Sequence, residues 1–396
     1  MKSYRRYIFS FLAVVFFLMG LVGAFNFLVD PYGVMGNLSI VGFNKVKSEN
    51  HNHVRLFKAL AITKLTPKSV FLGSSRAEVG LDPNHPALED YQPVYNLGIT
   101  GGNIYEAKRY LQHAIANQPD LKLVVLGLDF FMFNQFGKLT PSFRESRLEK
   151  TSITFQDAWE VLFSLDALIS SKLTIIRNRN EPNATGHFYP NGMRDTPYFI
   201  RETYHNQPQE IIFVEVLKAF RTRPEFYQTY QLSESNMNDL KSLIDICRQR
   251  GIKLELFISP CHATEWEVIR DAGFWPVFEE WKRRIVAMAT VWDFSGYNSI
   301  TTEPISNNMK NYIESSHYRK EVGDLVINRI FQYREETQPR DFGVLLTADN
   351  VEAQLAKIRS DRELWAKNNP DTVQLVKNLE PNPNCEFCNG VENFLK

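Results

Sequence analysis

The sequence predicts a three-layer α/β sandwich, built on a central parallel sheet of about five strands, that follows an N-terminal transmembrane helix. Short β-branched and apolar runs, typical of buried parallel strands, recur at residues 69–73, 93–97, 121–128, 253–259 and 291–294. Helical patterns separate most of these runs, and strands that alternate with helices favour right-handed βαβ units in one sheet. The membrane helix is predicted from a basic and then apolar N-terminus.

The composition excludes some classes of protein. The 396 residues, of which 44% are hydrophobic, can form a sizeable core in one large domain or two smaller ones. Lys plus Arg and Asp plus Glu number 45 each, so the charge balance indicates no nucleic-acid partner. Partners must therefore be inferred from individual sites.

The first 30 residues predict a membrane anchor. The basic residues Lys2, Arg5 and Arg6 come first. An uncharged apolar stretch, residues 7–29, then follows and is long enough to cross a bilayer. By the positive-inside rule the N-terminus is cytoplasmic and the main domain extracytoplasmic, which fits a single-pass protein of a bacterial inner membrane that faces the periplasm. A cleaved signal peptide is the alternative, although the apolar stretch exceeds the usual length of such a segment.

Three segments follow the anchor. A connecting segment, residues 31–67, leads into the α/β domain of residues 68–334. An insertion at about residues 130–234 interrupts the alternation after the third strand and could form a lid. Residues 335–396 form a polar C-terminal extension, which is expected to be poorly ordered after Asn378. Helical patterns cover residues 54–65, 104–117, 155–173, 211–220, 237–250, 321–333 and 351–365.

The four cysteines are too few for a disulfide scaffold. Cys385 and Cys388 form the one close pair, and without a second pair or a nearby histidine they favour a local disulfide or free thiols over a zinc site. No group of His, Asp and Cys residues has the spacing of metal ligands, so we expect no metal.

The run of residues 69–76 predicts a buried strand that delivers a serine hydroxyl. Its apolar part stops at Gly73-Ser74-Ser75, and glycine permits a tight exit that would hold Ser75 at the carboxyl end of the strand. Open α/β sheets bind ligands at that edge. Gly-Ser-Ser is also common turn chemistry, so the interpretation depends on partners elsewhere in the chain.

The partners are expected in residues 314–317, ahead of the last predicted helix of the domain. Glu314 precedes His317 by three residues. In a turn at the edge of the sheet, that spacing lets the carboxylate bind one imidazole nitrogen while the other nitrogen faces a serine, as activation of a hydroxyl requires. The alternative is an exposed loop acid beside a histidine that caps a helix or packs in the core.

The order of four short motifs resembles the SGNH/GDSL hydrolase superfamily. These are G-S-S at residues 73–75, N-L-G at 96–98, G-L-D at 127–129 and E-S-S-H at 314–317. Together with the anchor, they are similar to the membrane-anchored extracytoplasmic SGNH-like proteins that modify bacterial cell-envelope polymers, including the DltD-like and alginate O-acetylation groups. The resemblance covers residues 68 to 334 and implies an SGNH, or flavodoxin-like, sheet.

The resemblance implies a catalytic role for particular residues. Ser75 would be the nucleophile, with Ser74 as the second candidate in place of the usual aspartate, His317 the base and Glu314 the orienting acid. The backbone N–H groups of Ser75 and Gly98 would form the oxyanion hole. Glutamate replaces the usual aspartate of the last motif.

Asp129 stands where the family has an asparagine, and an ionised carboxylate cannot donate to an oxyanion. Asn103 could supply the missing amide or simply cap the next helix.

Other residues at the same edge of the sheet are candidates for binding substrate. Arg76 could bind an anionic group or form a salt bridge. His262 follows the fourth strand and could line the pocket or pack in a loop. Asp129 is a further candidate, and Asp293 could support His317 or form a turn.

We therefore expect a Ser-His-Glu esterase or O-acyltransferase that needs no cofactor and acts on an acylated glycan or another envelope polymer. A membrane acyltransferase is a potential partner, and no nucleic acid is expected. The alternative is a catalytically inactive SGNH-fold envelope protein that binds polymer or a membrane partner. A third hypothesis is a lipid esterase.

Overall fold

The computed structural model describes residues 2–380. Beyond Glu380 lie Cys385, Cys388 and most of the C-terminal stretch expected to be poorly ordered, so those predictions fall outside the described residues.

The centre of the structure is a six-stranded sheet in the order β2-β1-β3-β4-β5-β6. The first five strands are parallel to their neighbours, and β6 is antiparallel to β5. The strands are β1 (Ser69–Leu72), β2 (Val94–Asn96), β3 (Leu123–Leu128), β4 (Lys253–Ile258), β5 (Val291–Asp293) and β6 (Val344–Leu346). The predicted α/β class and the five predicted parallel strands are confirmed.

The central strands are the most deeply buried. Every residue of β1 and β3 is buried, which suits the continuous Ser-Val-Phe-Leu and Leu-Val-Val-Leu-Gly-Leu sequences of these strands. Because the first five strands run the same way, their carboxyl ends lie at one edge of the sheet, where their polar exits gather.

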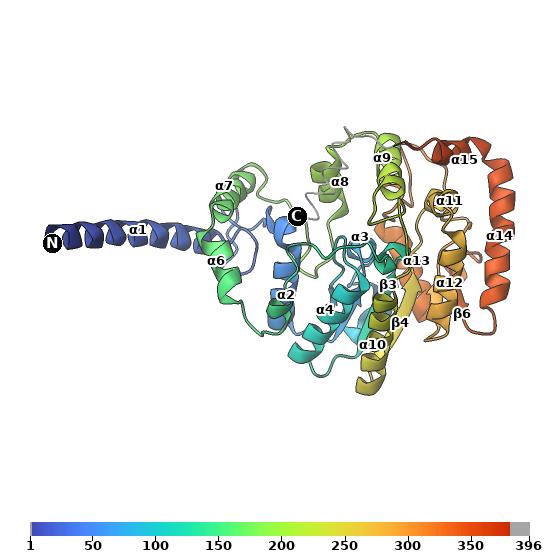
Figure 1. Cartoon of the computed structure of the whole chain (residues 1–396), viewed down its shortest axis with the longest axis horizontal. Coiled ribbons are helices and arrows are strands. Elements are labelled where there is room, and N and C mark those ends of the chain that lie inside the picture. Colours follow the sequence, from blue (N-terminus) through green and yellow to red (C-terminus); the bar gives the residue numbers. More distant parts are fainter. Residues whose placement is uncertain (1, 381–396) are drawn as a thin grey trace.

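Helices connect the strands and pack on the sheet (Figure 1). The helices of the domain outside the insertion are α2 (Val54–Leu65), α3 (Ser75–Gly80), α4 (Ile104–Asn117), α10 (Glu234–Arg250), α11 (Ala263–Asp271), α12 (Trp275–Val286) and α13 (Lys320–Phe331). Short 3₁₀ turns lie at η1 (Asn50–His53), η2 (Pro86–Tyr91) and η4 (Glu335–Thr337). The helices predicted at residues 54–65, 104–117, 237–250 and 321–333 are confirmed to within a few residues.

The sheet continues past residue 334, where the sequence interpretation ended the α/β domain. Beyond that residue, β6 pairs with β5, and α14 (Val351–Asn368) and α15 (Pro370–Lys377) follow it. α14 contacts α12, and α15 contacts α11. The strand of only three residues was not predicted, because so short an apolar run has no measurable period.

The insertion comprises η3 (Phe130–Phe133), α5 (Glu145–Leu148), α6 (Phe155–Phe163), α7 (Leu165–Asn180), α8 (Thr196–Tyr204) and α9 (Gln209–Thr222). A bridge between Asn134 and Leu232 brings its two ends together. The single helical patch predicted at residues 155–173 is two helices, because Ser164 ends α6 and its Oγ caps α7 by accepting from Ala167 N at 2.9 Å.

The N-terminal helix α1 (Lys2–Val29) projects from the rest of the protein (Figure 1). Its segment Tyr4–Val29 contains an 18-residue window with a mean hydropathy of 2.6 and is long and apolar enough to span a membrane. Its C-terminal end reaches the domain beside α6 and α7.

Two glycines allow α3 and α13 to cross closely. A Cβ atom added at Gly323 would lie 1.8 Å from the backbone oxygen of Gly80, and one added at Gly80 would lie 2.0 Å from Tyr318 Cε2. Since α3 begins at Ser75 and α13 follows His317, this crossing fixes the separation of the two segments.

We expect Gly323→Ala to force α3 and α13 apart and to lower the free energy of unfolding by about 1–3 kcal/mol, the usual cost of overpacking, or more. Urea unfolding measures this loss. Gly20→Ala is the matched control, because no atom lies within 4 Å of the Cβ it would add. Equal stability of Gly323→Ala and Gly20→Ala would contradict the close crossing.

Candidate active site

The turn between β1 and α3 places the two serines. Gly73 has a φ of +140°, and a Cβ there would lie 3.0 Å from Ala77 Cβ and 3.1 Å from Gly127 O, so the tight exit requires glycine. Ser74 is the N-cap of α3, and its Oγ accepts from Arg76 N at 3.2 Å. Ser75 is the first residue of α3 and is only partly buried.

Ser75, His317 and Glu314 lie together. Ser75 Oγ is 2.7 Å from His317 Nε2, although the two residues are 242 positions apart in the chain. The other ring nitrogen, His317 Nδ1, contacts Glu314 Oε1. A carboxylate at Nδ1 favours the tautomer with its proton there, so Nε2 is left to accept the Ser75 hydroxyl proton. This is the arrangement expected from the spacing of Glu314 and His317.

Glu314 is fully buried and bound on several sides. Its carboxylate accepts from Ser316 N at 2.7 Å and from His317 N at 3.1 Å, which also fixes the turn that carries the imidazole. Burial alone would raise the pKa of the Glu314 carboxyl, but the neighbouring His317 and these hydrogen bonds outweigh it and lower the pKa. The carboxylate is therefore ionised at neutral pH.

The insertion covers this group from α8. The ring of Phe199 meets the His317 imidazole edge-to-face, with centroids 5.8 Å apart. The Tyr204 hydroxyl hydrogen-bonds to the Glu314 carboxylate. Sequence reasoning identified neither residue, because no motif marks them and the insertion interrupts the strand–helix pattern.

Ser74 faces away from His317. It is fully buried, and its hydroxyl donates to Asp129 Oδ2 at the end of β3. Of the two candidate serines, only Ser75 contacts the histidine among the described residues.

Arg76 and Asp129, which were candidates for substrate binding, form a buried ion pair instead. Arg76 Nη1 lies 3.0 Å from Asp129 Oδ1, and both side chains are 1% exposed. The guanidinium also donates to Glu265 Oε2 at 2.6 Å and to Ser316 Oγ at 3.1 Å. Of the alternatives for Arg76, the salt bridge is the one observed.

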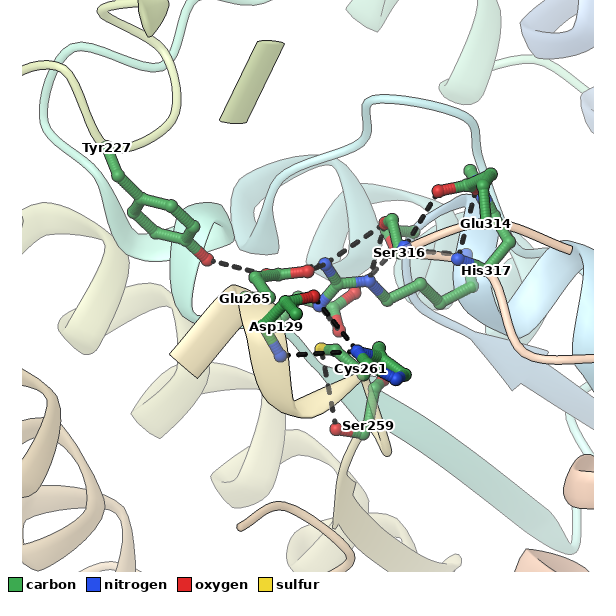
Figure 2. Close-up of polar contacts among 12 residues, drawn as sticks. Asp129, Tyr227, Ser259, Cys261, Glu265, Glu314, Ser316 and His317 are labelled. Atoms are coloured by element: carbon green, nitrogen blue, oxygen red, sulfur yellow. Dashed lines mark hydrogen bonds and ion pairs between the residues drawn. The ribbon is translucent and has the colours of Figure 1, made fainter. Parts of the chain in front are cut away.

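Asp129, Glu265 and Ser316 all accept hydrogen bonds from the Arg76 guanidinium. Figure 2 shows these three residues close together, with Glu314 and His317 on one side. Tyr227 from the insertion donates its hydroxyl to Glu265 Oε1 at 3.0 Å on the other side. Burial alone would lower the pKa of the Arg76 guanidinium, but the surrounding Cys261, Glu265 and Asp129 groups outweigh it and raise the pKa. Arg76 is therefore a permanent buried cation.

The oxyanion hole implied by the resemblance is not assembled around Gly98. The Gly98 N–H donates to Asn96 Oδ1 at 2.9 Å, and a Cβ at Gly98 would lie 2.5 Å from Glu78 N. Asn103 is the N-cap of α4, and its Oδ1 accepts from Glu106 N at 3.0 Å. For Asn103 the capping role is therefore the observed one. The Ser75 N–H, in the first turn of α3, has no intrahelical acceptor.

His262 and Asp293 are structural in this arrangement. His262 is buried at the start of α11, with Nδ1 2.9 Å from Thr264 Oγ1 and Nε2 2.7 Å from Glu303 O, and burial lowers its pKa to about 4. Of the two alternatives for His262, packing in a loop is therefore the one observed. Asp293 lies 2.8 Å from Lys282 Nζ, so it does not support His317.

A cavity of about 660 Å³ opens where the insertion meets the start of α13. Its lining includes Tyr189, Arg194, Arg319 and Lys320. No member of the Ser75, His317 and Glu314 group lines it, although Lys320 follows His317 by three residues. Within residues 2–380, no group of three or more His, Cys, Asp or Glu side chains is arranged to hold a metal ion.

Comparisons with family models, with curated proteins and with solved structures each found no match.

We expect Arg76→Leu to lower the free energy of unfolding by about 3–5 kcal/mol, because it leaves Glu265 and Asp129 buried without their cation. Arg284→Ala, which removes an ion pair to the exposed Glu234, is the control and should change stability little. Urea unfolding of both variants measures the difference. Similarly small losses of stability in Arg76→Leu and Arg284→Ala would contradict the burial of Arg76 as a paired cation.

Proposed function

We propose that this protein is a membrane-anchored acyl-transfer enzyme of SGNH type, an esterase or O-acyltransferase acting on a cell-envelope polymer. The observation that carries the proposal is the contact chain from Ser75 Oγ to His317 Nε2, at 2.7 Å, and from His317 Nδ1 to Glu314. The order of the motifs and the mostly parallel sheet support a three-layer SGNH sandwich.

The chemistry follows from this arrangement. Ser75 Oγ attacks the acyl carbon of an ester while His317 Nε2 takes the hydroxyl proton, and Glu314 stabilises the resulting imidazolium. The imidazolium returns the proton to the departing alcohol, which leaves an acyl-serine. Water or a polymer hydroxyl then gives its proton to His317 and attacks the acyl group. The bond from the acyl carbon to Ser75 Oγ breaks, the imidazolium returns the proton to Oγ, and hydrolysis or transfer is complete. The chain's own groups suffice for these steps, without a cofactor.

Stabilisation of the oxyanion is the weak part of the site. The Ser75 N–H is one candidate donor, whereas the Gly98 N–H is directed to Asn96. Loss of one donor typically costs about 2.7–4 kcal/mol, or roughly 100 to 1000-fold in rate. We therefore propose a slow enzyme, or one in which substrate binding reorients the loop of residues 96–98.

The polymer would bind across the cavity beside α13. Arg319, Lys320 and Tyr189 offer charged and aromatic groups to a polar chain, and Lys320 is three residues from His317. A membrane-anchored domain on the periplasmic face of a bacterial inner membrane would meet envelope glycans there, and a membrane acyltransferase could supply the acyl group.

The alternative is an inactive SGNH-fold protein that binds polymer or a membrane partner. The engagement of the Gly98 N–H in a structural hydrogen bond favours it, because this group was expected to donate to the oxyanion.

The proposal predicts covalent labelling of the detergent-solubilised full chain by a fluorescent fluorophosphonate, a reagent specific for activated serines. Ser75→Ala and His317→Ala should abolish the labelled band in a gel, because one removes the nucleophile and the other its base.

Ser74→Ala is the matched control. It removes the cap of α3 but should keep the label, since Ser74 faces Asp129. Absence of labelling in the wild-type chain favours the binding protein, and labelling that survives Ser75→Ala rejects Ser75 as the nucleophile.

Glu314→Gln tests the orienting acid. Glutamine can still accept from Ser316 N and His317 N but carries no charge, so the turn should persist while the labelling rate falls by on the order of 10⁴-fold. The rate is measured by stopping the fluorophosphonate reaction at intervals. Glu363→Gln, which alters an exposed acid on α14, should label at the wild-type rate, and an equal rate for Glu314→Gln would show that the carboxylate only forms the turn.

A further inference from the structure

Helix α6 has an inverted distribution of polarity. Its acid, Asp157, is fully buried and pairs with Arg147 Nη2 at 2.6 Å and Arg144 Nη1 at 2.8 Å. Two of its large apolar side chains point outward, with Phe155 83% exposed and Trp159 48% exposed, while Val161 faces the core. A surface helix of a water-soluble domain has the opposite pattern, because exposing apolar area to water is unfavourable.

Helix α7 repeats the inversion. It buries small and polar side chains, namely Ala167, Ser170, Ser171, Thr174 and Asn178. It exposes an apolar row, namely Leu165, Ile169, Leu173 and Ile176, with Leu165 78% exposed. The spacing of the row, at intervals of four, four and three residues, puts it on one face of the helix.

These two helices pack against the membrane helix α1. A Cβ added at Gly23 would lie 2.5 Å from Phe163 Cε1, so glycine lets α6 approach α1 closely. Asn26 Nδ2 donates to Leu162 O, and Ser171 Oγ donates to Asn26 Oδ1, each at 2.8 Å. Such buried contacts favour a retained anchor over a cleaved signal peptide.

A second segment exposes apolar residues near the same end of α1. Leu38, Ile40 and Val41 follow α1 in the chain, and Leu38 is 85% exposed. Their loop is bound to the end of α1, since Asn44 Nδ2 donates to Leu28 O at 3.1 Å. Apolar side chains of two separate segments are thus exposed near the point where α1 meets the domain. Figure 1 shows α6 and α7 beside that end of α1.

The point on α1 at which α6 and α7 are bound corresponds to a membrane boundary. A helix rises 1.5 Å per residue, so about 20 residues cross a hydrocarbon core of about 30 Å. A span that starts after Arg6 therefore ends near Asn26, the residue that binds α6 and α7. The exposed rows of these helices lie at the level of the leaflet from which the domain emerges, whichever side of the membrane that is.

We propose that this juxtamembrane patch, made of Phe155, Trp159, Leu165, Ile169, Leu173, Ile176, Leu38, Ile40 and Val41, is seated in the lipid of that leaflet. The acyl-chain boundary is the occupant that fits, because α6 and α7, which carry most of the patch, pack against the apolar and mostly exposed helix α1. The patch also carries a tryptophan, which is enriched at membrane interfaces. The proposal depends on α1 as an anchor and not on the Ser75 site. It gives the domain a fixed orientation on the membrane.

The test measures depth in the bilayer. The full chain, with Cys385→Ser and Cys388→Ser and with the buried Cys247 and Cys261 retained, is spin-labelled at Ile169→Cys. It is reconstituted into phosphatidylethanolamine–phosphatidylglycerol vesicles, and EPR compares collisions of the label with oxygen and with a water-soluble nickel chelate. Leu364→Cys is the matched control, an exposed leucine on α14, far from α1 in Figure 1.

We expect the ratio of oxygen to nickel collisions at residue 169 to exceed that at residue 364 several-fold. Equal ratios would place the patch in water and overturn the proposal. Protection of residue 169 from both reagents would also overturn it, because a protein partner or a second copy would then cover the patch.

Discussion

The arrangement of the candidate site depends on the ion pairs and hydrogen bonds of the buried Arg76 guanidinium. It binds Asp129 at the end of β3, Glu265 in α11 and Ser316 in the turn before α13, while its own backbone lies next to Ser75. Four segments distant in sequence are therefore fixed by one side chain. Burying these charges has a large desolvation cost, which is offset only when several partners are well placed. Loss of one partner would therefore destabilise the whole network.

The sequence predicted the part of this arrangement that is local. The run of residues 69–73 predicted a strand that ends at a serine, and the spacing of Glu314 and His317 predicted a carboxylate on one ring nitrogen, because both depend on neighbouring residues. The Gly98 N–H binds Asn96 Oδ1 only two residues away, but Asn96 is oriented by its hydrogen bonds to Ala77 O and Leu81 O, which the local sequence does not reveal. The partners of Arg76 depend on tertiary contacts, so the sequence left open whether Arg76 forms a salt bridge. Tyr204 and Phe199 were missed for the same reason, and β6 was too short to recognise.

The insertion links the two ends of the molecule. Its α8 contributes Phe199 and Tyr204 to the group around His317, and its α6 and α7 bind the end of α1. A rigid seating of α6 and α7 at a membrane would therefore constrain the same segment that covers His317 and Glu314. Separation of the insertion from the sheet would uncover the side chains of His317 and Glu314.

The two departures from the SGNH pattern that the chain resembles, both close to the proposed nucleophile Ser75, form one interaction. Ser74 stands where the family has an aspartate, and Asp129 stands where it has an asparagine, and the Ser74 hydroxyl donates to the Asp129 carboxylate. Two carboxylates at these positions would repel each other, whereas a hydroxyl and a carboxylate attract, and Arg76 neutralises the charge. For the proposed SGNH assignment, the two departures therefore count as one change in the turn and not as two independent losses. It leaves Ser75 facing His317, so the argument for an inactive site rests on the engaged N–H of Gly98 alone.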